Sequence, residues 1–181
     1  MSSLEQLWAG WRSAYVDGAT GAAAAPAPAG DREGGARGCV FCRILASGEP
    51  DESTHVLWRH PEQTAVALLN AYPYTTGHLM VMPARHVDRL ERLSGPESAA
   101  LWEGVGLAVR AIEAAYGPDG LNLGANLGRA AGAGIPDHLH FHALPRWVGD
   151  TNFTTALAGL RVLPEALGDS AERLRRAWPR G

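Results

Sequence analysis

Three histidines alternate with apolar residues over positions 138–144, which read HLHFHAL. Successive side chains of a β-strand point to opposite faces. A strand here therefore places all three imidazoles on one face and Leu139, Phe141 and Ala143 on the other. Three consecutive same-face histidines are rare on an ordinary half-buried strand. The segment predicts a strand that packs on a core with one face and presents an imidazole cluster on the other.

Two kinds of chemistry use such a cluster. Three histidines can hold a catalytic zinc ion, or a neutral imidazole can attack phosphorus while its neighbours bind phosphate oxygens. The glycine-rich segment 128–134 (GRAAGAG) lies directly upstream. Glycines let backbone N–H groups turn toward an anion. A phosphate-binding loop beside a row of histidines favours nucleotidyl transfer.

The remaining pattern predicts an α+β domain. Short apolar segments bounded by turn residues predict strands at 56–59, 64–70, 78–82 and 121–127, in addition to 138–144. The capping box Ser94-x-x-Glu97 begins a helix with an apolar stripe, and Gly117-Pro118 ends it. Strands joined by short turns and one long helix indicate an antiparallel sheet of about five strands.

The sequence divides into four parts. Residues 1–17 space their apolar side chains by three and four and predict an amphipathic arm. Residues 18–38 are mostly Gly, Ala and Pro and predict a linker. The domain is expected over 39–150. Helix-like spacing, broken at Pro164, predicts a helical extension over 151–181.

Composition excludes several function classes. The 181 residues include no lysine, which excludes a lysine Schiff base and a P-loop. A net charge of −3 lacks the basic surface expected of nucleic-acid binders. No apolar run is long enough to span a membrane, and the N-terminus does not resemble a secretory signal. We therefore expect a cytoplasmic protein that binds neither nucleic acid nor a membrane.

The two cysteines, Cys39 and Cys42, are spaced C-x-x-C. Two cysteines cannot build a disulfide framework, so the pair is either half of a zinc site or a redox pair. No strand is predicted before Cys39, as a thioredoxin-like redox pair would require, and this favours zinc.

The pattern H-φ-H-φ-H-φ-φ, with φ apolar, resembles the signature of the histidine-triad (HIT) family of nucleotide hydrolases and transferases. Residues 39–45 (CVFCRIL), Asn70 with 77–83 (GHLMVMP), and 122–128 (NLGANLG) are similar to other segments of that family. Residues 7–12 (LWAGWR) and 145–153 (PRWVGDTNF) resemble its actinobacterial diadenosine tetraphosphate phosphorylase branch.

The resemblance implies cleavage of dinucleoside polyphosphates, such as diadenosine tetraphosphate, through a nucleotidyl-histidine intermediate. His140 is implied as the nucleophile and His142 as the ligand of the α-phosphate. His138 and His78 complete the catalytic set. Nucleotide contacts are implied for His142, Asn70 (to the ribose), Asn126, Gly132 and Gly134.

The resemblance also implies a metal ion and an assembly. Cys39, Cys42, His86 and His138 are the implied ligands of one zinc ion. Because a Cys2His2 set closes the tetrahedron, the ion is expected to be structural, and no catalytic metal or organic cofactor is required. The family implies a homodimer, and the N-terminal arm could support a tetramer.

Gly134 and Ile135 depart from the family pattern, in which a hydroxyl or amide at one of these positions assists the leaving group. An amine leaving group needs that proton donor, whereas a polyphosphate does not. The departure therefore favours dinucleoside polyphosphates. The alternatives are a purine nucleoside phosphoramidase of the Hint type, a non-catalytic nucleotide-binding module, and a hydrolase with catalytic zinc on the three histidines.

Overall fold

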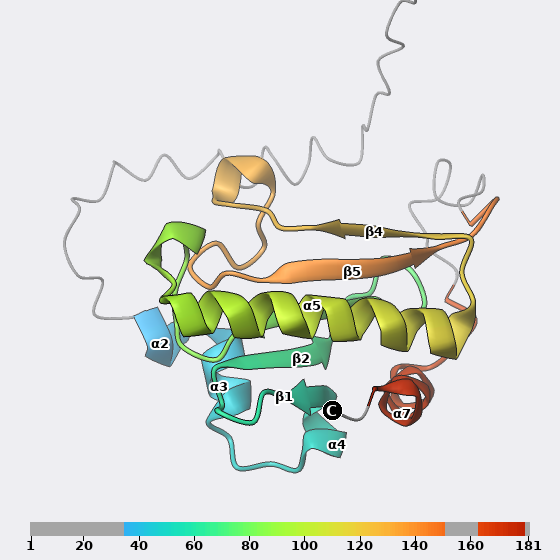
Figure 1. Cartoon of the computed structure of the whole chain (residues 1–181), viewed down its shortest axis with the longest axis horizontal. Helices are drawn as coiled ribbons and strands as arrows, with labels where there is room; N and C mark the ends of the chain where they lie inside the picture. Colours follow the sequence, from blue (N-terminus) through green and yellow to red (C-terminus); the bar gives the residue numbers. More distant parts are fainter. Residues whose placement is uncertain (1–34, 151–162, 180–181) are drawn as a thin grey trace, which may run out of the picture.

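A computed structural model describes residues 35–150 and 163–179, drawn in colour in Figure 1. One long helix lies across a five-stranded sheet, as the sequence predicted. The elements, in chain order, are α2 (Gly35–Gly38), α3 (Val40–Leu45), α4 (Asp51–Thr54), β1 (Val56–Arg59), β2 (Ala65–Leu69), β3 (Leu79–Pro83), a 3₁₀ turn (Leu90–Arg92), α5 (Gly95–Tyr116), β4 (Gly120–Gly124), a second 3₁₀ turn (Arg129–Ala131), β5 (Phe141–Arg146) and α7 (Leu167–Ala177).

All neighbouring strands are antiparallel, in the order β1-β2-β3-β5-β4. Every residue of β2 and β3 is buried, because helices cover both faces of this part of the sheet. The register sets Met80 of β3 and Gly124 of β4 on either side of His142 in β5. The α+β class and the strand count are confirmed.

Two apolar clusters occupy the two faces. On the α5 face, Leu79, Val81, Leu139 and Ala143 pack with the buried side of the helix. On the opposite face, Met80 and Met82 pack with residues from the α3 segment, including Cys39 and Phe41. The alternation at 138–144 therefore works as expected, since Leu139 and Ala143 belong to the α5 face.

The predicted capping box begins α5. The Ser94 hydroxyl accepts the Glu97 N–H, and the Glu97 carboxylate accepts the Ser94 N–H at 2.8 Å. Arg85 pairs with the same carboxylate at 2.7 Å and, with the Ser94 N–H, lowers the pKa of Glu97 to about 2. Gly117, with φ +52°, ends the helix.

The strand containing the histidines begins later than predicted. β5 covers Phe141–Arg146, so His138 and His140 precede it. Pro83 ends β3 and has no N–H to continue a ladder, and the Leu139 N–H bonds instead to the Val87 carbonyl. β4 is likewise shorter than predicted and ends at Gly124.

The C-terminal helix is part of the core. Ala171 and Leu174 of α7 are buried in the α5-face cluster, and Arg175 donates to the Val56 carbonyl at 3.0–3.1 Å. At the other end of the chain, α2 forms within the predicted linker. Residues 1–17, the rest of the linker before residue 35, and 151–162 lie outside the described residues. No described helix is long and apolar enough to cross a membrane.

Candidate active site and metal-binding group

The ring of His140 is held in one tautomer by the backbone. Its Nδ1 lies 2.8 Å from the carbonyl oxygen of His138. A carbonyl can only accept, so Nδ1 carries the proton and the lone pair is on Nε2. Burial lowers the pKa of His140, which keeps the ring neutral at pH 7. The neutral Nε2 is therefore ready to act as a nucleophile.

A hydrogen bond from His78 fixes the tautomer of His142. The Tyr74 N–H donates to His78 Nδ1 at 3.1 Å, so the proton of His78 is on Nε2. That Nε2 lies 2.9 Å from Nδ1 of His142 and donates to it. The proton of His142 must then be on its Nε2. This tautomer chain gives His142 one N–H for a substrate oxygen.

The sheet explains why these two residues meet. Met80 lies directly opposite His142 in the β3–β5 register. His78 precedes Met80 by two residues and therefore shares its face, one position diagonal to His142. His78 is fully buried, and its ring lies 5.0 Å from that of His142.

The row of rings continues to His140 and to Tyr74. The ring centroids of His140 and His142 are 4.9 Å apart, and Tyr74 lies 4.7 Å from His78. Burial, and then the neighbouring His140, lowers the pKa of His142 to about 4. The catalytic set predicted from sequence is thus brought together as neutral, hydrogen-bonded imidazoles.

Asn70 supports His78. Its Oδ1 accepts the Tyr72 N–H at 2.9 Å, and its Nδ2 lies 3.3 Å from Nδ1 of His78. The turn chemistry of asparagine accounts for the Oδ1 contact, whereas Nδ2 reaches the His78 side chain eight residues further along. Its predicted contact with the ribose stays a prediction.

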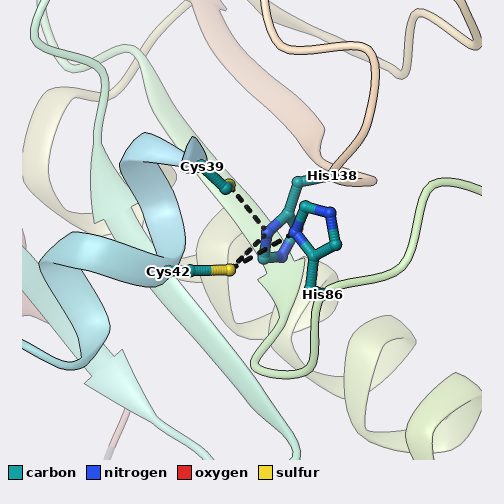
Figure 2. A group of neighbouring side chains, drawn as sticks. All are labelled: Cys39, Cys42, His86 and His138. Atoms are coloured by element: carbon teal, nitrogen blue, oxygen red, sulfur yellow. Dashed lines mark hydrogen bonds between the residues drawn. The ribbon is translucent and has the colours of Figure 1, made fainter. Parts of the chain in front are cut away.

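Four donors from three segments converge into one candidate metal group. Figure 2 shows the side chains of Cys39, Cys42, His86 and His138 pointing toward a common centre. Their ligand atoms all lie within 4.8 Å of one another. Cys39 Sγ is 3.4 Å from His138 Nδ1, and Cys42 Sγ is 3.3 Å from His86 Nδ1.

These separations fit tetrahedral zinc. Bonds of about 2.3 Å to sulfur and about 2.05 Å to nitrogen place the two ligand atoms about 3.6 Å apart. A histidine ligand usually donates its other ring N–H to a second group, which fixes the tautomer. His138 does so, because its Nε2 donates to the Pro83 carbonyl at 2.9 Å and leaves Nδ1 for the ion. Burial lowers the pKa of His138 to about 4 and so keeps it neutral. Burial raises the pKa of Cys42 to about 11, and a bound cation would reverse this.

His138 joins the two sites. Its side chain belongs to the metal-binding group, and its carbonyl oxygen fixes the tautomer of His140. Phe41 packs edge-on against both rings, at 5.4 Å from His138 and 5.2 Å from His140. The candidate metal-binding group thus lies next to His140.

The glycine loop is more closed than the sequence suggested. The N–H groups of Ala131, Gly132 and Ala133 bond to carbonyls within the loop, and Asn126 Nδ2 lies 3.5 Å from the Gly132 carbonyl. Gly132 and Asn126 therefore shape the loop. Gly134 is exposed, and a Cβ there would meet nothing within 4 Å.

Three contributors to the site were not predicted. Tyr74 packs on the His78–His142 pair and donates its N–H, Phe41 covers the rear of the triad, and the carbonyl of Pro83 orients His138. Phe41 lies within the C-x-x-C segment and Pro83 within GHLMVMP, so both belong to motifs identified from the sequence. No pattern in the sequence singled out Tyr74.

The chain matches known proteins over most of its length. The HIT domain model matches residues 50–148. AP-4-A phosphorylase of Mycobacterium tuberculosis is 38% identical over 177 residues, which cover 98% of this chain and 86% of that protein.

Solved structures share the fold. A zinc-bound histidine triad family protein from Mycobacterium smegmatis is 28% identical with a TM-score of 0.62, covering 79% of this chain and 94% of that one. A HIT-like protein from Bartonella henselae is 20% identical with a TM-score of 0.59, covering 76% of this chain and 95% of that one. The latter is a likeness of fold alone.

Proposed function

The chain belongs to the HIT family, and from this premise we propose that it is an enzyme that cleaves dinucleoside polyphosphates through a nucleotidyl-His140 intermediate. The observation that carries the proposal is the 2.8 Å hydrogen bond from His140 Nδ1 to the His138 carbonyl. It leaves a neutral Nε2 lone pair, as nucleophilic attack at phosphorus requires. The similarity to AP-4-A phosphorylase over 98% of the chain supports the substrate class.

In the first step, His140 Nε2 attacks the α-phosphorus of diadenosine tetraphosphate. The new N–P bond forms as the bond from phosphorus to the bridging oxygen breaks, and ATP leaves with that electron pair. Nδ1 keeps its proton, and the positive charge on the ring is stabilised by the His138 carbonyl. The His142 Nε2–H donates to a phosphate oxygen as negative charge develops there.

In the second step, an acceptor oxygen attacks the same phosphorus and the N–P bond breaks. Inorganic phosphate gives ADP beside ATP, whereas water gives AMP beside ATP. The relative's name, a phosphorylase, supports phosphate as the acceptor. Neutral His140 is regenerated, and the acceptor proton passes to solvent.

Zinc is the metal we expect at Cys39, Cys42, His86 and His138. Two thiolates and two imidazoles are its preferred ligands, and the zinc-bound Mycobacterium smegmatis structure supports the assignment. When bound, the ion supplies structural stability. The chain itself provides the nucleophile and the phosphate ligand, so no catalytic metal or organic cofactor is needed.

Two exposed side chains support the expected homodimer. Trp102 of α5 is 53% exposed, and Leu123, on the edge strand β4, is 50% exposed. Exposed large apolar residues, and a strand edge that no described residue pairs with, are typical of interfaces. Light scattering of the whole chain and of Trp102→Glu tests this. The cytoplasmic location and the absence of a nucleic-acid or membrane partner stay predictions.

The runner-up is a phosphoramidase, and Gly134 argues against it. An amine leaving group needs a proton, and Gly134 and Ile135 offer no side-chain donor. A polyphosphate leaves without protonation at neutral pH.

The test is to incubate the protein with diadenosine tetraphosphate, with and without inorganic phosphate, and to separate the nucleotides formed. ADP and ATP in equal amounts support a phosphorylase, and AMP and ATP a hydrolase. His140→Ala should abolish both. Wild-type rates in that variant would refute the mechanism, and tight binding without turnover by the wild type would favour the non-catalytic module.

A further inference from the structure

Tyr116, the last residue of α5, packs against the backbone of Gly77. Gly77 has φ +77°, and a Cβ built there would lie 2.6 Å from Cε2 of Tyr116. Real Cβ atoms do not approach other atoms so closely. The tyrosine ring therefore leaves no room for a side chain at position 77, so only glycine fits there.

The Tyr116 ring thus contacts the residue that directly precedes His78. The His78 carbonyl oxygen accepts the Asn70 N–H at 3.0 Å, and the His78 N–H donates to the Thr75 carbonyl at 3.2 Å. These hydrogen bonds hold the His78 backbone on one side, and Tyr116 limits Gly77 on the other. The His78 ring must stay 2.9 Å from His142 to fix its tautomer. A shift of this backbone would break that hydrogen bond.

Tyr116 is itself held from the C-terminal segment. Its hydroxyl donates to Glu165 Oε2 at 2.8 Å, and the Ser170 hydroxyl donates to the same oxygen at 2.7 Å. Arg173 pairs with the other carboxylate oxygen at 3.0 Å and places its Cζ 5.2 Å from the tyrosine ring centroid. Burial raises the pKa of Tyr116 to about 12, so the hydroxyl remains a donor.

We propose that Tyr116 is a positioning residue for His78, and that Glu165 holds it there from outside the region that the family model matches. The inference rests on the roles proposed above for His78 and His142. The C-terminal segment then supports the active site in addition to completing the core.

The first test reads the tautomer without any substrate. Nitrogen-15 NMR of the histidine rings should show His142 with an unprotonated Nδ1 and a protonated Nε2 in the wild type. Tyr116→Leu should give averaged His142 nitrogen shifts, and Glu165→Ala a smaller change in the same direction. In a His78→Ala background, Tyr116→Leu should change the His142 shifts no further.

The second test is kinetic. Tyr116→Leu should lower kcat about tenfold, because small misplacement of a catalytic group is costly, and leave KM within about twofold. Tyr116→Phe keeps the ring against Gly77 but loses the hydrogen bond to Glu165, so it should lower kcat no more than Glu165→Ala does. Glu165→Ala should lower kcat about threefold.

The outcomes separate this inference from the proposed function. If the wild type cleaves no dinucleoside polyphosphate, the proposed function fails while the NMR test still decides the role of Tyr116. Wild-type His142 shifts in both Tyr116→Leu and Glu165→Ala would overturn the inference, as would an equal effect of Tyr116→Leu with and without His78. If Tyr116→Leu does not fold, Glu165→Ala decides by the same readout.

Discussion

Replacing Gly77 with alanine should destabilise the protein by an amount that the geometry divides into two parts. A non-glycine residue at φ +77° costs about 1–2 kcal/mol. The added methyl group would lie 2.6 Å from Tyr116, and overpacking of this kind costs about 1–3 kcal/mol more. The free energy of unfolding should therefore fall by about 2–5 kcal/mol.

Gly117→Ala is the matched control. Gly117 also has a positive φ, +52°, but a Cβ there meets nothing within 4 Å. It should cost only the backbone part, about 1–2 kcal/mol. Urea unfolding of both variants at pH 7.5 measures the difference.

A double-mutant cycle isolates the contact. In a Tyr116→Leu background the smaller, flexible side chain can yield, so the penalty of Gly77→Ala should shrink toward that of Gly117→Ala. An equal penalty in both backgrounds would show that the ring of Tyr116 does not press on Gly77. Equal costs for Gly77→Ala and Gly117→Ala would refute the reasoning in the same way.

Three further predictions concern the metal, the leaving group and pH. About one equivalent of zinc should co-purify with the wild type, and Cys42→Ser should lose it and lower the free energy of unfolding by several kcal/mol. The kcat per folded molecule should fall far less in Cys42→Ser than in His140→Ala. Metal analysis that finds no zinc in freshly purified wild-type protein would contradict this. A side chain at position 134 meets nothing within 4 Å, so Gly134→Ser should leave the free energy of unfolding unchanged. Its hydroxyl supplies a proton donor for an amine leaving group, so AMP release from adenosine 5′-phosphoramidate should rise about tenfold or more. An unchanged rate would count against the leaving-group argument. Because the pKa of His142 is lowered to about 4, the unfolded chain binds more protons than the folded protein between pH 6.5 and 4. This half-buried group should therefore cost no stability above pH 6.5 and lower the free energy of unfolding by about 1–2 kcal/mol near pH 4. Urea midpoints that do not fall as the pH is lowered would contradict this prediction.

The sequence was informative wherever a local pattern determines a structure. The alternation at 138–144 predicted which side chains enter the α5-face cluster, and Ser94 with Glu97 predicted the start of the long helix. The C-x-x-C and the two histidines were named from a family pattern, and the structure gathers all four. Each of these rests on spacing that a strand, a helix or a metal ion imposes.

Other features depend on tertiary contacts that no local pattern carries. β5 begins at Phe141 because Pro83, far away in the sequence, ends the neighbouring ladder. The loop N–H groups of Gly132 and its neighbours were expected to face an anion, but the loop folds onto its own carbonyls. The tautomer of His142 depends on the Tyr74 N–H, a backbone group that every residue except proline carries.

The central claim is that His140 carries the nucleotidyl group during turnover, and direct trapping tests it. The protein is mixed with diadenosine tetraphosphate in the absence of phosphate, quenched within milliseconds in alkali to preserve the N–P bond, digested, and analysed by mass spectrometry. We predict an adenylyl group on the peptide that contains residues 138–142, localised to His140 and missing from His140→Ala. An adenylyl group on another residue, or turnover in which no covalent adduct forms at any quench time, would contradict the account.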